Sequence, residues 1–289
     1  MQAEQLTSIY ISYRSYLFAI AYNMLGEVQE AEDVVQDVFE RLLQGPERGM
    51  EHPKAYLGRM VVNRSIDRLE HKKREREVYP GPWLPTPVMT ESREDQPGDI
   101  LSYAVLCLLE SLNPVERAVL ILREAFDYDY SEISSLCDIR EDHCRQLLHR
   151  AKEKVRRPLK VGQTDEARRQ ELLQKFITAC FSGDAVELSE LLHRDIMLHA
   201  DGGGKASAAT KPLHGAMNVA RFLAGFGAKA EAAAVHYQFV WVNGQAVVVL
   251  VQGEQVISIM IPVIEDGIIT ELQVMRNPDK IFFSSAVTN

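Results

Sequence analysis

The sequence predicts a multidomain chain: two all-helical domains joined by a proline-rich linker, followed by an α+β domain with a curved antiparallel sheet. Three observations predict this organisation. Apolar residues recur at helical spacing in the first 76 residues and again from about 100 to 158, five prolines lie between those stretches, and β-branched runs with hairpin turns fill the last third. A chain of 289 residues has room for two or three domains at roughly 100–200 residues each.

The composition limits the class of protein. Hydrophobic residues make up 46% and charged residues 25%, which excludes a mainly disordered or collagen-like chain. No apolar run reaches the ~18 residues that a membrane span requires, and the N-terminus lacks the basic and apolar regions of a signal peptide. The four cysteines form no CxxC pair. We therefore expect a reduced, cytoplasmic protein with free thiols and no membrane partner.

The first block, residues 1–76, is predicted to hold three helices. A periodic apolar segment is interrupted at Gly26, and a second one stops at Gln44-Gly45-Pro46. Pro53 then stands where a third helix would begin, and this helix continues to about Arg76.

Residues 77–99 are predicted to be a linker. Five prolines forbid a long helix there, and acidic residues outnumber the single basic one. Trp83 and Leu84 are unusual in a solvated linker, because a tryptophan exposes much apolar area. We expect this segment to dock on another part of the chain.

The second block, residues 100–160, carries the pattern of a helix-turn-helix. Asn113 fits a helix N-cap, with Pro114 at the first helical position. A short helix with Ser131 as its expected cap leads through a tight turn at 137–139 into a long basic helix from Arg140 to about Arg157, which Pro158 ends.

The third block, residues 166–289, begins with helical periodicity and becomes strand-rich after Leu198. Asn243-Gly244 and Asp266-Gly267 separate β-branched runs, as in β-hairpins. Helices followed by a meander of long strands predict helices on one face of a curved antiparallel sheet.

Charge is segregated along the chain. The net charge is −9, yet residues 59–76 and 140–157 each hold seven basic and three acidic residues. Two separated basic helices are suited to contact a phosphate backbone at two points. Two plain solvated helix faces are the alternative.

Several motifs in the first 160 residues resemble those of bacterial sigma-70-type factors. Residues 31–43 (AEDVVQDVFERLL) resemble the conserved helix that binds the clamp region of the largest subunit of RNA polymerase. Residues 53–57 and 61–68 resemble the part that opens the promoter and binds its minus-ten element, and residues 113–117 and 130–151 resemble the domain that binds the minus-thirty-five element. The order of these motifs and the short linker are similar to the extracytoplasmic-function type. The resemblance implies a sigma factor that binds core RNA polymerase and directs transcription initiation from promoter DNA.

Three further motifs are residues 83–87 (WLPTP), 201–205 (DGGGK) and 277–280 (NPDK). Together they resemble the subgroup that carries a fused domain of the SnoaL-like, nuclear-transport-factor-two-like fold. The resemblance implies that the fused domain, expected over residues 166–289, regulates activity in place of a separate anti-sigma protein. Thr86 stands where the usual linker motif has an acidic residue. The residues implied to make regulatory contacts between domains are Trp83, Leu84, Pro85, Asp201, Gly202, Gly203, Gly204, Lys205, Asn277, Pro278, Asp279 and Lys280.

The candidate binding residues follow from helix faces and side-chain chemistry. The polar face opposite the apolar stripe of residues 31–43 is predicted to bind polymerase. It comprises Asp33, Gln36, Asp37, Glu40 and Arg41. Amide, carboxylate and basic side chains that suit bases and phosphates mark the predicted DNA-binding positions. These are Asn63, Arg64, Asp67, Arg68, Lys72 and Lys73 in the first block, and Arg140, His143, Cys144, Arg145, Gln146 and Arg150 in the second. The ring of Tyr56 fits either base stacking or the core.

We expect no catalysis, cofactor or metal. Cys137, His143, Cys144 and His149 lack the paired spacing of a zinc site. The loop at 201–205 lacks the order of a phosphate-binding loop. His199, Asp201, His236 and Trp241 are candidates to line a pocket, so a small-molecule ligand of the C-terminal domain stays open.

Two other functions compete with the sigma-factor interpretation. The first is a helix-turn-helix regulator with a ligand-sensing tail, which would not need the acidic helix at 33–40. The second is an isomerase- or hydrolase-like enzyme with a DNA-binding domain, which would need a convergent polar pocket.

Overall fold

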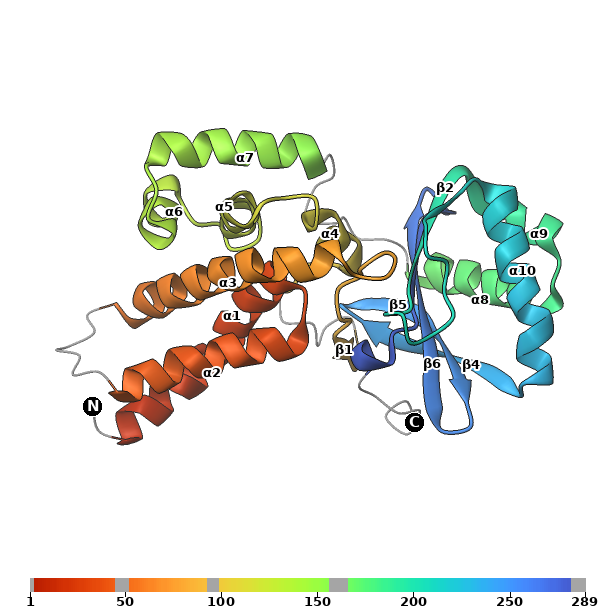
Figure 1. Cartoon of the computed structure of the whole chain (residues 1–289), viewed down its shortest axis with the longest axis horizontal. Coiled ribbons are helices and arrows are strands. Elements are labelled where there is room, and N and C mark those ends of the chain that lie inside the picture. The colour runs from red at the N-terminus through yellow and green to blue at the C-terminus, as the bar shows by residue number, and fades with distance from the viewer. Residues whose placement is uncertain (1–2, 45–51, 93–98, 156–165, 282–289) are drawn as a thin grey trace. The chain divides into compact units, whose positions relative to one another are not determined.

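The computed structural model describes residues 3–44, 52–92, 99–155 and 166–281, and its ribbon is drawn in Figure 1. The chain forms two compact units. The first comprises Met1–Glu77 and Gln96–Val161, and the second comprises Val78–Asp95 and Gly162–Asn289. The segment between the two helical blocks therefore belongs to the C-terminal unit, and the first unit is discontinuous in sequence.

The first unit is helical, as predicted. Its helices are α1 (Ala3–Leu25), α2 (Val28–Gln44), α3 (Pro53–Glu77), α4 (Tyr103–Leu109), α5 (Pro114–Glu124), α6 (Tyr130–Cys137) and α7 (Glu141–Val155). Gly26 ends α1 with a positive φ of 69°, a conformation that glycine adopts without steric cost. The predicted helix end at 45–46, the predicted end of α7 at 157–158 and linker residues 93–98 lie outside the described residues.

The two helical blocks pack against each other within the first unit. Helix α3 contacts α5 and α6, and α1 contacts α5. The buried guanidinium of Arg117 donates from Nη1 to Met24 O at 2.7 Å and from Nη2 to Leu109 O at 2.6 Å. Asn23 accepts from the Leu101 backbone N–H at 3.0 Å. Buried polar side chains thus fix the contact, since each would otherwise lack a hydrogen-bond partner.

One predicted cap is wrong. Helix α6 is capped by Asp129 rather than Ser131: the Asp129 carboxylate accepts from Glu132 N at 2.8 Å, and Glu132 accepts from Asp129 N at 2.8 Å. Ser131 lies inside the first turn and donates its hydroxyl to Asp129 Oδ1. This reciprocal pair is a capping box, and the cap predicted at Asn113 forms the same arrangement with Glu116.

The second unit places helices on one face of a seven-stranded sheet, ordered β1-β4-β5-β6-β7-β2-β3. Its elements are β1 (Met89–Thr90), α8 (Glu166–Ser182), α9 (Ala185–Glu190), β2 (Leu192–Asp201), β3 (Leu213–His214), α10 (Ala216–Ala232), β4 (Val235–Val242), β5 (Gln245–Gln252), β6 (Gln255–Glu265), β7 (Ile268–Met275) and a short 3₁₀ turn (Pro278–Lys280). Strands β4 to β7 form the predicted antiparallel meander.

Two features of this unit differ from the prediction. Strand β2 runs parallel to β7, so the sheet is mixed rather than purely antiparallel. Helix α10 was not predicted from the sequence. Its described buried side chains are Val219, Ala220, Leu223 and Ala230. These are mostly small, so their periodic signal is weak. The chain passes through α10 between β2 and β4, which lie far apart in the sheet order.

Among the described residues, no helix combines the length and apolar character that crossing a bilayer requires.

Candidate nucleic-acid interface and linker site

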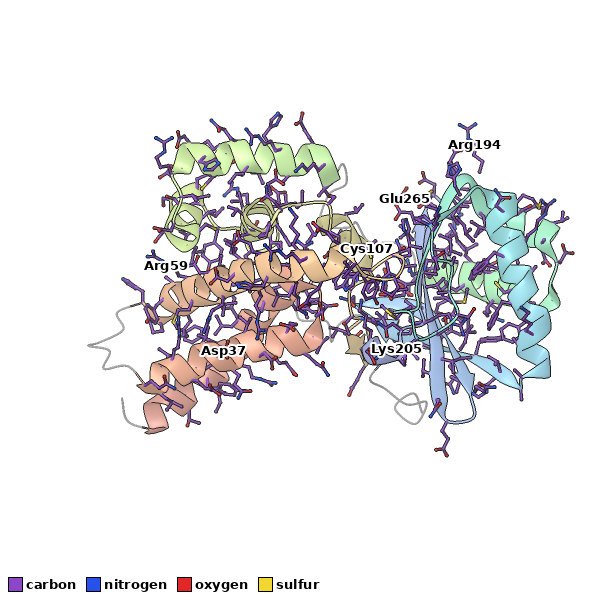
Figure 2. All side chains as sticks on the ribbon, viewed as in Figure 1. Asp37, Arg59, Cys107, Arg194, Lys205 and Glu265 are labelled. Carbon is purple, nitrogen blue, oxygen red and sulfur yellow. The ribbon has the colours of Figure 1, made fainter. Side chains whose placement is uncertain are left out.

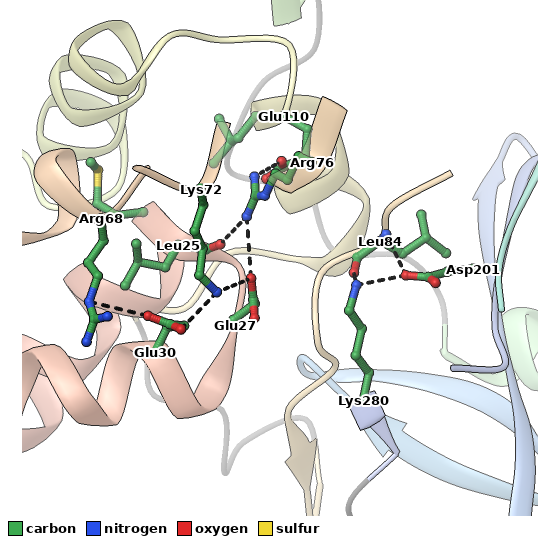
Figure 3. A network of polar contacts seen from close by, with 12 residues as sticks. Leu25, Glu27, Glu30, Arg68, Lys72, Arg76, Leu84, Glu110, Asp201 and Lys280 are labelled. Carbon is green, nitrogen blue, oxygen red and sulfur yellow. Dashed lines mark hydrogen bonds and ion pairs between the residues drawn. The ribbon is translucent and has the colours of Figure 1, made fainter. Parts of the chain in front are cut away.

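A series of ion pairs joins basic side chains of α3 to acidic side chains at the start of α2 and just before it (Figure 3). Lys72 Nζ lies 2.9 Å from carboxylate oxygens of both Glu27 and Glu30, and Arg68 Nε lies 3.4 Å from Glu30. The side chain of Lys72 is only 19% exposed. Lys72 was predicted to contact DNA phosphates; in this form of the protein two carboxylates already bind its ammonium, while Lys73 is exposed.

The predicted polymerase-binding residues lie on the side of α2 that faces away from its buried stripe. Asp33, Gln36, Glu40 and Arg41 are exposed, and Asp37 (labelled in Figure 2) is half-buried. Asp37 lies 3.7 Å from Arg64, and Gln36 donates to Glu40 at 2.8 Å. The polymerase-binding role of these residues stays a prediction.

The predicted minus-ten-binding residues are distributed along the accessible part of α3. Asp67 is exposed, and Asn63, Arg64 and Arg68 are partly exposed. Tyr56 is 36% exposed, so its ring lies at the surface rather than in the core. Stacking of Tyr56 on a base stays a prediction.

Helix α7 contains one wrong site prediction. Cys144, predicted to point toward DNA, is fully buried, because it precedes Leu147 and Leu148 by three and four residues and shares their core-facing stripe. The other predicted residues of the recognition helix are exposed: Arg140, which immediately precedes α7, and His143, Arg145, Gln146 and Arg150 within it.

The buried cysteines of this domain are poor nucleophiles and poor metal ligands. Burial raises the pKa of the Cys137 thiol to about 12 and also raises that of Cys144. Within the described ranges, no group of His, Cys, Asp and Glu side chains is arranged to hold a metal ion.

Two residues that sequence analysis missed lie beside Arg145. These residues are Tyr130, the first residue of α6, and Arg123. The guanidinium carbon of Arg145 lies 4.6 Å from the centroid of the Tyr130 ring, and the guanidinium carbon of Arg123 lies 5.1 Å from the same centroid. Arg123 lies in the last turn of α5 and also donates to Tyr128 O at 2.8 Å. The only sequence signal for this contact is that Arg123 and Tyr130 stand on either side of residues 124–129, which lead from the end of α5 to α6.

The linker docks inside the second unit through a buried ion pair (Figure 3). Lys280 Nζ lies 2.8 Å from Asp201 Oδ2 and donates to Leu84 O at 2.6 Å. The Leu84 N–H donates to the same carboxylate at 3.0 Å. The side chains of Lys280 and Asp201 are 8% and 0% exposed. The three motifs of the linker, the 201–205 loop and the 277–280 turn therefore meet at one place.

Aromatic side chains complete this linker site. Lys280 Nζ lies 4.1 Å from the Trp83 ring centroid and 5.1 Å from that of Tyr79. The Tyr79 hydroxyl donates to Asp201 Oδ1 at 2.6 Å and accepts from Asn277 Nδ2 at 2.8 Å. Burial, followed by the hydrogen bond to Asp201, raises the pKa of Tyr79. Tyr79 was not among the predicted residues.

The glycine loop, residues 202–204, approaches its neighbours closely. A Cβ at Gly203, whose φ is 59°, would lie 2.4 Å from the Asn277 side chain, and one at Gly204 would lie 2.9 Å from Pro80. Only glycine fits both positions. Next to the loop, an exposed pair joins Lys205 to Asp279.

After this site the linker adds a strand to the sheet. Met89 pairs with Val242 and Thr90 with Trp241. The Asn243 N–H donates to Val88 O at 2.8 Å, and Asn243 Oδ1 accepts from the Val88 N–H at 3.0 Å. Pro85 and Thr86 are buried between the two anchors.

The four residues suggested for a ligand pocket do not share one face of the sheet. His199 pairs with Gln273, and Asp201 with Met275. Trp241 instead pairs with Ala246, which belongs to the helix-covered core, and His236 is exposed. A small-molecule ligand of this unit stays an open prediction without support from these side chains.

Comparison with known proteins is consistent with this geometry. The family "Sigma-70 region 2" matches residues 9–75, and "Sigma-70, region 4" matches residues 102–155. The ECF RNA polymerase sigma factor SigJ of Mycobacterium tuberculosis is 29% identical over 92% of this chain and 90% of its own length. The probable ECF sigma factor SigI of the same organism is 29% identical over 66% of this chain and 68% of its own.

A solved structure also resembles this chain. The crystal structure of M. tuberculosis SigJ superimposes with a TM-score of 0.75 at 27% identity, covering 95% of this chain and 97% of that one. The two family matches fall within the first unit, while the structural match extends through the second.

Proposed function

Because the chain is a sigma factor of the extracytoplasmic-function type, which binds RNA polymerase and promoter DNA, we propose that α2 contacts the polymerase clamp while α3 and α7 bind the minus-ten and minus-thirty-five elements. The observation that carries this proposal is the presence of both sigma-70 regions, each with an exposed polar helix at the predicted positions. Sigma factors are generally not enzymes, and we propose no catalytic role for the second unit.

The exposed acidic face of α2 supports the polymerase contact. Asp33 and Asp37 are 60% and 40% exposed in their side chains and carry no core packing. Exposed carboxylates pair with basic residues of a partner and increase the rate and specificity of association. The clamp of the largest subunit is the partner that the family resemblance implies.

We further propose that the described first unit is a closed form that opens on the promoter. The minus-ten and minus-thirty-five elements are about 25 base pairs apart, which is about 85 Å at 3.4 Å per base pair. A 25-residue helix such as α3 is only about 37 Å long at 1.5 Å per residue. The contacts of α3 with α5 and α6 cannot persist while the two regions occupy elements so far apart.

The fused unit is proposed to control this opening through the linker. Residues 79–90 form hydrogen bonds and strand pairs with the rest of the second unit, which leaves less free chain to connect α3 and α4. A regulator changes such an equilibrium only through contacts that differ between the two forms. The Lys280–Asp201–Leu84 cluster is a candidate for such a contact.

Reconstitution with core RNA polymerase tests both proposals. A pull-down with core enzyme, followed by transcription from candidate promoters, should show sigma activity for the full chain. Removal of residues from 166 onward and Trp83→Ala should each change transcription, since both remove the dock. Val78→Ala is the matched control, because Val78 lies in the same segment but is 83% exposed. Wild-type transcription from both altered proteins would refute regulation through the linker, whereas absence of core binding would refute the sigma role.

A further inference from the structure

The Arg123–Tyr130–Arg145 cluster gathers two guanidinium groups on one aromatic ring. The ring centroid of Tyr130 lies 4.6 Å from the Arg145 guanidinium carbon and 5.1 Å from that of Arg123. The three residues come from three different helices of the region 4 domain, so the fold rather than local sequence brings them together. Tyr130 and Arg123 are not among the predicted DNA-binding residues.

The ring constrains Arg145 without competing with DNA. The side chain of Arg145 is 56% exposed, and an arginine side chain loses rotamer entropy when a ligand immobilises it. Stacking on a tyrosine face restricts its rotamers before DNA arrives. Glu141 also lies 3.4 Å from Arg145, but its carboxylate repels an approaching phosphate, whereas the ring carries no net charge.

The second guanidinium makes the cluster a site for an anion. Arg123 is held by its hydrogen bond to Tyr128 O, which leaves its other N–H donors for a ligand. Two guanidinium groups at one ring concentrate positive charge at this place, and positive charge attracts an anion. Planar guanidinium forks match the oxygen geometry of a phosphate.

We propose that Tyr130 is a positioning residue for promoter recognition, and that it holds Arg145 beside Arg123 to bind backbone phosphate at the minus-thirty-five element. This inference rests on the proposed DNA contact of α7 and adds two residues to it. The ring of Tyr130, rather than its hydroxyl, is the group that acts.

A double-mutant cycle on the reconstituted holoenzyme tests the proposal. Binding to a promoter fragment is measured for wild type, Tyr130→Leu, Arg145→Ala and the double variant. Tyr130→Leu should weaken binding about 3–10-fold, as expected for loss of a cation–π contact. In the Arg145→Ala background the same change should cost at least threefold less than in the wild-type background. Tyr130→Phe, which keeps the ring, should retain at least half of the wild-type affinity.

The salt dependence of promoter binding tests the phosphate contact of Arg123. Arg123→Gln should reduce the slope of log affinity against log salt concentration by about 1, as expected for one lost phosphate contact. Independent effects of Tyr130→Leu and Arg145→Ala, equal losses in the Phe and Leu variants, or an unchanged slope for Arg123→Gln would each overturn the proposal. If Arg145→Ala itself leaves binding and its salt dependence unchanged, the proposed DNA role of α7 fails first.

Discussion

Replacement of Lys280 by methionine should release the linker from the second unit. Methionine keeps most of the side-chain volume but removes the ammonium, which lies 2.8 Å from Asp201 Oδ2 and 2.6 Å from Leu84 O. The Asp201 side chain is fully buried, so its carboxylate cannot recover the lost partner from water.

The expected cost is about 3 kcal/mol, at the lower end of the range for removing one partner of a buried ion pair. The lower end applies because three donors stay on the carboxylate: the Leu84 N–H, the Tyr79 hydroxyl and the Gly203 N–H. A local loss of this size corresponds to an increase in opening on the order of 100-fold.

Hydrogen exchange of the Leu84 amide measures this opening directly, because that N–H donates to Asp201. Its exchange should accelerate on the order of 100-fold, while amides of the interior strand β5 should change less. Lys205→Met is the matched control. It removes the ammonium of the Lys205–Asp279 pair, whose side chains are both 58% exposed, and should have little effect. Equal exchange of Leu84 in both variants and in wild type would refute the argument that Lys280 anchors the linker.

Reversal of charge at Asp33 and Asp37 should abolish binding to core RNA polymerase and leave the fold intact, since neither side chain packs in the core; wild-type affinity in a pull-down would contradict this. Arg145→Ala should weaken promoter binding and reduce the salt slope by about 1, and a footprint that does not change between low and high salt would show that α7 does not touch DNA. Arg117→Met should destabilise the first unit by about 3 kcal/mol, because it leaves the buried carbonyl oxygens of Met24 and Leu109 without their donor. Denaturant unfolding of the full chain measures this loss, and an unchanged unfolding midpoint would exclude it. Burial lowers the pKa of His199, so the unfolded chain binds a proton at this residue more readily than the folded protein does. The contribution of neutral His199 to stability is therefore fully present above about pH 6.5 and is lost as the pH falls toward the lower folded-state pKa. The thermal midpoint should fall more between pH 7.5 and 5.5 in wild type than in His199→Gln.

Local sequence rules predicted the features that depend on neighbours in the chain. The stripe that buries Val34, Val38 and Leu42 follows from helical periodicity alone, and so does the exposed acidic face opposite it. The cap at α6 shows the limit of such rules. Ser131 and Asp129 both suit an N-cap, and the choice depends on which residue begins the helix.

Features that depend on distant contacts were predicted incompletely. The motifs with Trp83, Asp201 and Lys280 were expected to meet, but the part played by Tyr79 was not, because a tyrosine among prolines carries no local signal. The prediction for Cys144 was wrong because Leu147 and Leu148 follow it by three and four residues, so all three side chains share the core-facing stripe of α7. The parallel pairing of β2 with β7 joins residues about 70 positions apart, beyond the reach of any turn motif.

Because the linker belongs to the C-terminal unit, it can reach its final contacts only after that unit has been synthesised. The segment Val78–Asp95 emerges from the ribosome long before the residues that hold it, since 190 residues separate Thr90 from Lys280. At 5–20 residues per second, translation of that stretch takes roughly 10–40 s. Once residue 160 is made, both promoter-binding regions are complete, while the linker between them still lacks its contact with Lys280. A nascent or prematurely terminated chain therefore carries both sigma regions without the contact between Lys280 and the linker that the finished protein has.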